Sequence, residues 1–464
     1  MEPGDAAAYA GPPNEARIGF FVGKGGVGKS TLASATAVRA ALSGERVLVV
    51  STDQAHSLGD VLGSAVQPSG GGTPVRILSE ERGADGGGAD GGGADGGGAA
   101  GGGADGGGAD GGGAAGFLDA VALDTLALLE STWRPVASVM AARFPASEIN
   151  DVAPEELCAV PGIQEVLGLR AVAALAATGR WDYVVVDCAS TADALRMLTL
   201  PATFAMYAER CWPRHRRLSA AVDDLRTAAA VALVETCAVQ MESLATLLAD
   251  GERVSAHLVL TPERVVAAEA VRTLGSLALM GVRVNELIVN QVLFQDDSYE
   301  YRNLPDHPAF DWYAARIAEQ QSVLEELADT IGALRLVLTP HLPGEPIGPK
   351  ALGQLLDEAR SRDGTPPPGP LRPVVDRESG SGLDAVYRMR IELPRLDAGA
   401  LRLGRAGDDL IIGVADVRRR VRLAAVLRRC TVTGAVLRGP ELTVRFRPDP
   451  QLWPVPVAAS EGLG

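Results

Sequence analysis

The chain has 464 residues, of which 47% are hydrophobic, and this is enough for two or three domains with cores of their own. Its formal net charge of −15 argues against nucleic acid as a partner, because an acidic surface repels phosphates. The five cysteines are scattered without a C-x-x-C pair, so the sequence offers no zinc framework and suits a reducing compartment. Residues 1–16 lack the basic and apolar segments of a signal peptide, so we expect a disordered tail and a cytoplasmic protein.

The first motif in chain order is a glycine-rich loop between a predicted buried strand, 18–22, and a predicted alanine-rich helix, 30–42. It fits the pattern G-x-x-x-x-G-K-[ST], in which backbone N–H groups and the helix N-terminus surround a phosphate. Lys29 is expected to reach the β- and γ-phosphates and the Ser30 hydroxyl to ligate Mg²⁺, so the predicted cofactors are ATP and Mg²⁺. The residues assigned to nucleotide binding here are Gly23, Lys24, Gly25, Gly26, Val27, Gly28, Lys29, Ser30 and Thr31.

Two further apolar stretches lead to a carboxylate. Residues 47–50 come shortly before Asp53, and residues 181–186 come directly before Asp187. In a parallel sheet the carboxyl ends of the strands share the edge at which ligands bind. We therefore predict that Asp53 acts on the nucleotide and that Asp187, in a Walker B pattern, holds Mg²⁺ through water. For Asp53 the structural alternative is an N-cap of the segment that follows.

Between these two stretches lies a low-complexity run, 83–116, built on the repeat Ala-Asp-Gly-Gly-Gly. It is too polar and glycine-rich to pack, and it lacks the ligand spacing of a calcium loop, so we predict a disordered insertion. Residues 125–180 and 202–250 are rich in alanine and predict a helical subdomain. The remaining predicted elements are strands at 120–124, 257–260, 286–290 and 334–338, and a helix over 262–280.

Strands that alternate with helices predict an α/β fold, here a P-loop NTPase domain over 17–360 with a mainly parallel sheet and the inserted helical subdomain. Proline- and glycine-rich sequence over 361–382 predicts an interdomain linker. Over 383–450 apolar and charged residues alternate with a period of two, which predicts a small C-terminal antiparallel β-sandwich. Its arginines indicate either a solvated sheet face or a basic binding surface. Residues 451–464 are a predicted tail.

Two blocks carry a resemblance to a known family. S-T-D-Q-A-H-S-L-G-D at 51–60 is similar to switch I, S-T-D-P-A-H-S-L-S-D, of the ATPases that include the arsenite-pump ATPase and the ATPase of guided entry of tail-anchored membrane proteins. D-C-A-S-T-A-D-A-L-R at 187–196 resembles their switch II, D-T-A-P-T-G-H-T-L-R. The loop is of the deviant kind, with Lys24 as a signature lysine in a chain that has only three lysines. The resemblance covers roughly 17–360, and the C-terminal region resembles the α-crystallin-like domain of some prokaryotic members.

The resemblance implies a homodimer that closes over two ATP molecules, with Lys24, Lys29 and Asp53 as the catalytic residues. Lys24 would stabilise charge on the partner's nucleotide, and Asp53 would orient the attacking water. Asn290 would contact the adenine, and Pro340 belongs to a segment that would pack near the base. Opening and closing would move the helical subdomain, whose apolar face would accept a hydrophobic client protein or a membrane partner.

The sequence also departs from the family pattern. Gln54 replaces the switch I proline, and Ser190, Ala192 and Asp193 replace the proline, glycine and histidine of switch II, which would slow or recouple hydrolysis. Cys158 lies near the expected place of a metalloid ligand, but a buried structural cysteine is the alternative. Three functions therefore stay open: an ATPase that gates a client surface, a metalloid-stimulated subunit of an efflux pump, and a non-catalytic nucleotide-gated chaperone.

Overall fold

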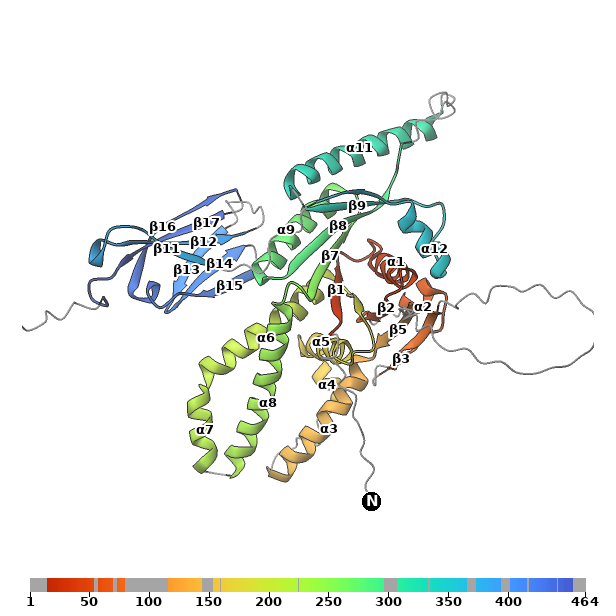
Figure 1. Cartoon of the computed structure of the whole chain (residues 1–464). Coiled ribbons are helices and arrows are strands. Elements are labelled where there is room, and N and C mark those ends of the chain that lie inside the picture. The colour runs from red at the N-terminus through yellow and green to blue at the C-terminus, as the bar shows by residue number, and fades with distance from the viewer. Residues whose placement is uncertain are drawn as a thin grey trace, which may run out of the picture.

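Figure 1 shows the computed structural model of the chain. It describes residues 15–53, 57–69, 73–79, 116–143, 153–158, 160–223, 225–295, 307–332, 334–364, 373–393, 401–414, 417–439 and 441–453. Most of the predicted tails and of the predicted 83–116 insertion lies outside these ranges, as does Gln54. The N-terminal tail was predicted to extend to residue 16, but Ala16 is buried in the core.

A large, mostly parallel sheet organises the first three quarters of the chain, as predicted. Its strand order is β10-β9-β8-β7-β1-β6-β2-β5-β3, with β4 paired to β5. Among its described strands, only the β4–β5 and β10–β9 pairs are antiparallel. The strands are β1 (Arg17–Val22), β2 (Arg46–Ser51), β3 (Pro68–Ser69), β4 (Val75–Ser79), β5 (Phe117–Leu123), β6 (Tyr183–Asp187), β7 (Val254–Leu260), β8 (Arg283–Val292), β9 (Arg335–Pro340) and β10 (Arg360–Arg362).

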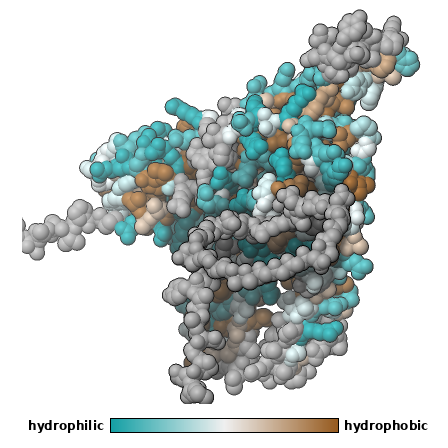
Figure 2. Space-filling view, turned by 45° about the vertical axis from the view of Figure 1, so that its right-hand side comes forward, coloured by the Kyte–Doolittle hydropathy of each residue, from teal (hydrophilic) through white to brown (hydrophobic). Residues whose placement is uncertain are grey.

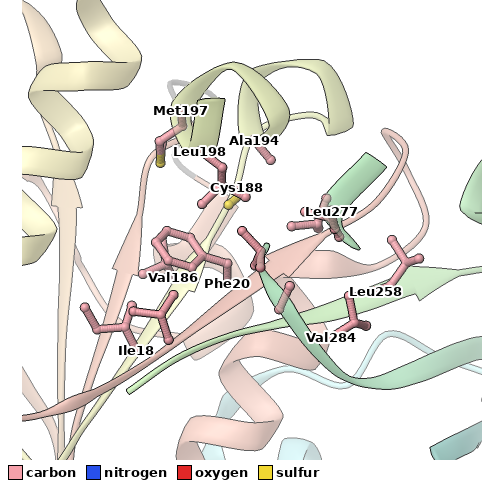
Figure 3. Close-up of a cluster of buried hydrophobic side chains, with 14 of the residues drawn as sticks. Ile18, Phe20, Val186, Cys188, Ala194, Met197, Leu198, Leu258, Leu277 and Val284 are labelled. Carbon is pink, nitrogen blue, oxygen red and sulfur yellow. The ribbon is translucent and has the colours of Figure 1, made fainter. Parts of the chain in front are cut away.

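The central strands are continuous apolar runs because helices cover both faces of the sheet. Side chains alternate along β1, so that Phe20 joins the core on one face and Phe21 joins the core on the other. Figure 3 shows the Phe20 side, where Met197 and Leu198 of a covering helix pack beside Cys188. The helices on that face are α5 (Ile163–Ala176), α6 (Thr191–Cys211), α8 (Leu225–Leu248), α9 (Arg264–Met280) and α11 (Pro308–Ile331); on the other lie α1 (Lys29–Leu42), α2 (Ser57–Leu62) and α12 (Gly348–Asp357).

Long helices extend from the sheet as a separate projection (Figure 1). We call α6, α8, α3 (Thr125–Arg143) and α7 (Arg214–Asp223) the helical arm; the short α4 (Pro154–Cys158) lies between α3 and α5. The second helical block was predicted from residue 202, but α6 already begins at Thr191 and has Pro201 in its interior. The Ser190 side chain caps α6 by accepting a hydrogen bond from the Asp193 N–H at 3.2 Å, and this start places the helix directly after β6.

The C-terminal region is a β-sandwich, as predicted. One sheet has the order β11-β12-β17-β16 and the other β13-β14-β15, with an apolar core between them. The strands are β11 (Val374–Ser379), β12 (Val386–Glu392), β13 (Leu401–Ala406), β14 (Asp409–Val414), β15 (Val417–Arg422), β16 (Cys430–Arg438) and β17 (Glu441–Pro448), with short 3-10 helices η2 (Gly382–Asp384) and η3 (Leu427–Arg429). The predicted linker 361–382 is therefore too wide, because β10 still pairs with β9 and β11 is already part of the sandwich.

The sandwich contacts the α/β domain on α9 and α6. Leu279, in the last turn of α9, is buried in the sandwich core, and the Arg419 side chain donates to its carbonyl oxygen at 2.9 Å. Arg210, at the end of α6, pairs with Asp409 of β14 at 2.9 Å. Figure 2 shows the sandwich at the left, where hydrophobic residues lie between hydrophilic ones on its exposed surface.

Candidate nucleotide-binding site

The glycine-rich loop connects β1 to α1 at the carboxyl edge of the sheet, as the sequence predicts. Gly28 caps the helix with φ 90° and ψ 30°, a left-handed conformation that favours glycine. A Cβ at Gly28 would collide with the amide nitrogen of Asn290, and one at Gly23 with the backbone oxygen of Val259. The glycines therefore do more than expose N–H groups to a phosphate, because they also let two other strands pack against the loop.

The two loop lysines have different surroundings. Lys29 is buried, and its Nζ donates to the backbone oxygen of Lys24 at 3.0 Å, across the loop. Lys24 is exposed, and its ammonium has no ion-pair partner within the described ranges. Lys29 is thus buried and bonded across the loop, whereas Lys24 is exposed to solvent.

Asp187 ends β6 beneath the loop. It is fully buried, and neither carboxyl oxygen has a hydrogen-bond partner in the part of the chain that the structure describes. Burial raises the pKa of Asp187 to about 6; the nearby Ser30 hydroxyl and the Lys29 charge lower it, and the Asp53 charge raises it. Two orphan carboxyl oxygens close to a serine hydroxyl are a donor set of the kind that hydrated Mg²⁺ takes in ATPases, so Ser30 and Asp187 fit the predicted metal role.

Asp53 lies two residues beyond the end of β2, and β2 is hydrogen-bonded to β6. The Thr52 N–H donates to the Asp187 backbone oxygen at 3.0 Å, and the Asp53 N–H donates to the Ser51 hydroxyl at 3.2 Å. These two hydrogen bonds fix the segment that follows β2 next to the end of β6. Asp53 consequently lies at the cavity, as predicted.

The cavity in front of the loop has a volume of about 650 Å³. Of the predicted residues, it is lined by Gly25, Gly26, Gly28, Lys29, Ser30, Thr31, Asp53, Asn290 and Pro340. Gly23, Lys24, Val27 and Asp187 do not line it; Gly23 and Lys24 border a small space beside α9. An ATP-sized ligand fits a cavity of this volume.

Asn290, which was predicted to contact the adenine, lies at the cavity. Its amide nitrogen donates to the Val27 backbone oxygen at 3.0 Å, and its amide oxygen accepts from the Thr339 hydroxyl at 2.8 Å. Both ends of the buried amide therefore bind protein groups, so Asn290 braces the glycine-rich loop against β9. The contact with the base stays a prediction.

Two residues at the cavity were not assigned from the sequence. The Ser57 hydroxyl lies 3.0 Å from the Ser30 hydroxyl. Gln291 has φ 60° and is the one described non-glycine residue with a positive φ. Ser57 belongs to the switch I block, so the resemblance carried a signal for it; the positive φ of Gln291 had no local signal, because glutamine rarely adopts this conformation.

Comparison with known proteins decides the family. A family model described as anion-transporting ATPase matches residues 16–74 and 116–359, and a model described as an HSP20-like domain found in ArsA matches 384–446. The chain belongs to the anion-transporting ATPase family. The predicted resemblance, including the C-terminal α-crystallin-like (HSP20-like) domain, is confirmed.

Individual relatives agree with this assignment. The chain is 65% identical to Protein Rv2184c of Mycobacterium tuberculosis over 96% of its own length and 99% of the relative. It is 33% identical to protein SCO2128 of Streptomyces coelicolor over 94% and 98% of the two chains. It is also 24% identical to an arsenical pump-driving ATPase of Escherichia coli, over 89% of this chain and 59% of that protein. The conserved extent includes the ATPase domain and the sandwich.

Proposed function

We propose that this member of the family hydrolyses Mg-ATP as a homodimer and that the cycle opens and closes a hydrophobic client-binding surface on the helical arm, in membrane-protein targeting or chaperoning. The convergence of Lys29, Ser30 and Asp53 on one cavity, with Asp187 buried close behind them, carries the enzymatic part of this proposal. Asp53 and Asp187 are far from Lys29 and Ser30 in the sequence. The carboxyl ends of the neighbouring strands β1, β2 and β6 bring the four residues together.

In the reaction the N–H groups of the loop and the Lys29 ammonium bind the phosphates of ATP. Ser30 and Asp187 would hold Mg²⁺, which supplies charge neutralisation on the β- and γ-phosphates. The Asp53 carboxylate accepts a hydrogen bond from a water molecule and so orients the oxygen of that water toward the γ-phosphorus. The new P–O bond forms as the bond between that phosphorus and the β–γ bridging oxygen breaks, and ADP leaves with the electron pair.

The structure supports coupling between this site and the helical arm through α6. Cys188 follows Asp187 directly, and it is buried against Met197 and Leu198 of α6 (Figure 3). Ser190 caps the same helix. A shift of Asp187 on metal binding would therefore move the start of α6, and a rigid helix would carry the movement to its far end.

The arm offers an apolar surface for a client. Phe204 and Tyr207 of α6, Leu218 and Val222 of α7 and Val239 of α8 are all exposed. By length and composition alone, Ala230–Leu248 of α8 could cross a membrane, although a core helix passes the same test; only 22% of its apolar window is buried. An apolar helix that buries so little of itself within the chain is suited to receive another apolar helix.

The second candidate, a metalloid-stimulated pump subunit, draws on the name of the Escherichia coli relative. The described residues contain no group of three or more Cys, His, Asp or Glu side chains that could hold a metal ion. Burial raises the pKa of the Cys158, Cys188 and Cys237 thiols, which disfavours the thiolate that a metalloid would bind. The third candidate, a non-catalytic chaperone, predicts nucleotide binding without turnover in single-turnover experiments.

The client part is tested with the Asp53→Asn variant, which should hold ATP and stay closed, purified from its own host with Lys29→Ala as control. We expect proteins with one exposed apolar helix to co-purify with the first variant only. Adding Phe204→Asp and Tyr207→Asp to the first variant should release them, and adding Val374→Asp, an exposed apolar site on the sandwich, should not. Equal recovery from all variants would contradict the proposal. Stimulation of ATPase activity by arsenite, lost in cysteine variants, would favour the pump candidate.

A further inference from the structure

The Ser57 hydroxyl reaches the nucleotide cavity from α2 and lies against the predicted metal ligand Ser30. Its oxygen is 3.0 Å from the Ser30 oxygen, a distance at which one hydroxyl donates to the other. Both residues line the cavity. The proposed reaction gives Ser30 a role and gives Ser57 none. A second hydroxyl in direct contact with a metal ligand occupies the position of a group that orients that ligand.

The core of the protein fixes Ser57 at this position. Ser57 is the first residue of α2, and Leu58, which follows it, is fully buried in the core on the α1 side of the sheet. Leu62, at the end of the same short helix, is buried in that core as well. Ser30 lies in the first turn of α1, which packs against α2. The two hydroxyls therefore meet because two helices share one core.

The contact leaves Ser30 with an acceptor on the side away from Asp187. Burial raises the pKa of Asp187 and the nearby Ser30 hydroxyl lowers it, which places this carboxyl close to Ser30. A serine hydroxyl has one hydrogen and two lone pairs. When a lone pair is given to a cation, the hydrogen must be directed away from the cation and needs an acceptor outside the coordination shell. The Ser57 oxygen is placed to accept that hydrogen.

The same contact connects the predicted metal site to the segment that carries Asp53. Before Asp53, the N–H and the hydroxyl of Thr52 both donate to the Asp187 backbone oxygen, at 3.0 and 3.2 Å. After Asp53, Ser57 is hydrogen-bonded to Ser30. Asp53 thus belongs to a short stretch that is bonded at both ends to the residues predicted to hold Mg²⁺. A change at either of these residues reaches Asp53 through a few positions of chain.

We propose that Ser57 is a positioning residue whose oxygen accepts the hydrogen of the Ser30 hydroxyl, so that a lone pair of Ser30 is directed to Mg²⁺. The inference rests on the metal role of Ser30 in the proposed function and adds the residue that orients it. Removal of such an orienting group weakens metal binding by about 10- to 100-fold. Alanine at this position removes the hydroxyl and threonine keeps it, so two substitutions separate the hydrogen bond from the volume of the side chain.

The test measures binding of Mn²⁺, as a probe for Mg²⁺, to the full chain with ADP bound. Electron paramagnetic resonance counts the free Mn²⁺, so the measurement needs no turnover. We expect the dissociation constant for Mn²⁺ to rise about tenfold in Ser57→Ala and to return to the wild-type value in Ser57→Thr. Affinity for ADP with EDTA present should not change in either variant. Ser64→Ala is the matched control, because Ser64 is a described serine just after α2 that does not line the cavity.

The double variant Ser30→Ala, Ser57→Ala tests whether Ser57 acts through Ser30. If it does, removing the Ser57 hydroxyl has no further effect once the Ser30 hydroxyl is gone, and additive losses would contradict the proposal. Unchanged Mn²⁺ affinity in Ser57→Ala overturns it. An equal loss of ADP affinity without metal also overturns it, because Ser57 would then shape the pocket. Wild-type Mn²⁺ affinity in Ser30→Ala would instead remove the metal role of Ser30 from the proposed function.

Discussion

The nucleotide cavity and the helical arm place their polar and apolar groups in opposite ways. At the cavity, the charged side chains of Lys29 and Asp187 are buried, and the two carboxyl oxygens of Asp187 have no described partner. On the arm, apolar side chains such as Tyr207 and Val222 are exposed. Each arrangement lowers the stability of the free protein. A bound cation would offset this cost at the cavity, and a bound apolar partner would offset it on the arm. The comparison indicates that the proposed binding sites of this chain are the places where the fold leaves polar atoms without a partner or apolar side chains exposed.

The largest expected effect is at the cavity, where Lys29→Ala removes the buried ammonium that is bonded across the loop and is predicted to bind the phosphates. We expect the dissociation constant for ATP to rise at least 100-fold, which corresponds to about 2.7 kcal/mol. Isothermal titration measures it. Near-normal affinity in a folded variant would show that the phosphates bind elsewhere.

The buried charge of Asp187 makes stability depend on pH. Its pKa is about 6 in the folded chain against the ordinary 3.8, so the fold favours the neutral acid. This contribution is fully present below about pH 4 and is lost as pH rises to about 6, by up to about 3 kcal/mol in metal-free protein. Chemical denaturation at pH 4 to 7 should show this decline in wild type relative to Asp187→Asn. If the free energy of unfolding changes with pH in the same way in both proteins, the raised pKa of Asp187 is contradicted.

The brace between Asn290 and the loop gives a smaller effect. Asn290→Ala leaves the Val27 backbone oxygen and the Thr339 hydroxyl without their partner, which costs about 1–3 kcal/mol of stability. ATP affinity should fall about tenfold, because the loop is no longer held in its binding conformation. Thr339→Val is the milder control. If affinities for ATP and for inorganic triphosphate fall equally, the brace is supported; a loss for ATP alone would restore the predicted base contact.

The smallest effect is expected on the arm. Val222 is 85% exposed, so Val222→Ser should change the free energy of unfolding by less than about 0.5 kcal/mol. Met197→Ala, in the buried turn of α6 beneath the arm, should cost about 2–5 kcal/mol. Denaturant titration of both variants measures the contrast. A large loss at Val222 would mean that the arm surface is part of the core and not a binding face.

The sequence predicted the features that are determined by residues close together in the chain. The loop, the apolar strands and the carboxylates that follow them depend on neighbouring residues, so the sequence predicted that Lys29, Ser30, Asp53 and Asp187 lie at the carboxyl edge of the sheet. The period-two pattern likewise predicted the C-terminal sandwich.

Features that depend on distant contacts were missed. The bond from Asn290 to Val27 joins residues that are 263 positions apart. The early start of α6 is set by the Ser190 cap and by burial of Pro201, which local propensity reads as a helix breaker. The exposure of Trp312 also needed coordinates, because an aromatic residue on a helix normally predicts a core face.

The central claim is that Asp53 drives hydrolysis at a site that binds ATP through other residues. The most direct test is single-turnover hydrolysis of ATP by wild type and by Asp53→Asn, with nucleotide affinity measured on the same preparations. We predict that the variant binds ATP within about threefold of wild type and hydrolyses it at least 100-fold more slowly, a difference of about 2.7 kcal/mol in the barrier. Equal rates of hydrolysis would contradict the account, and loss of both properties would assign Asp53 to the fold and not to the reaction.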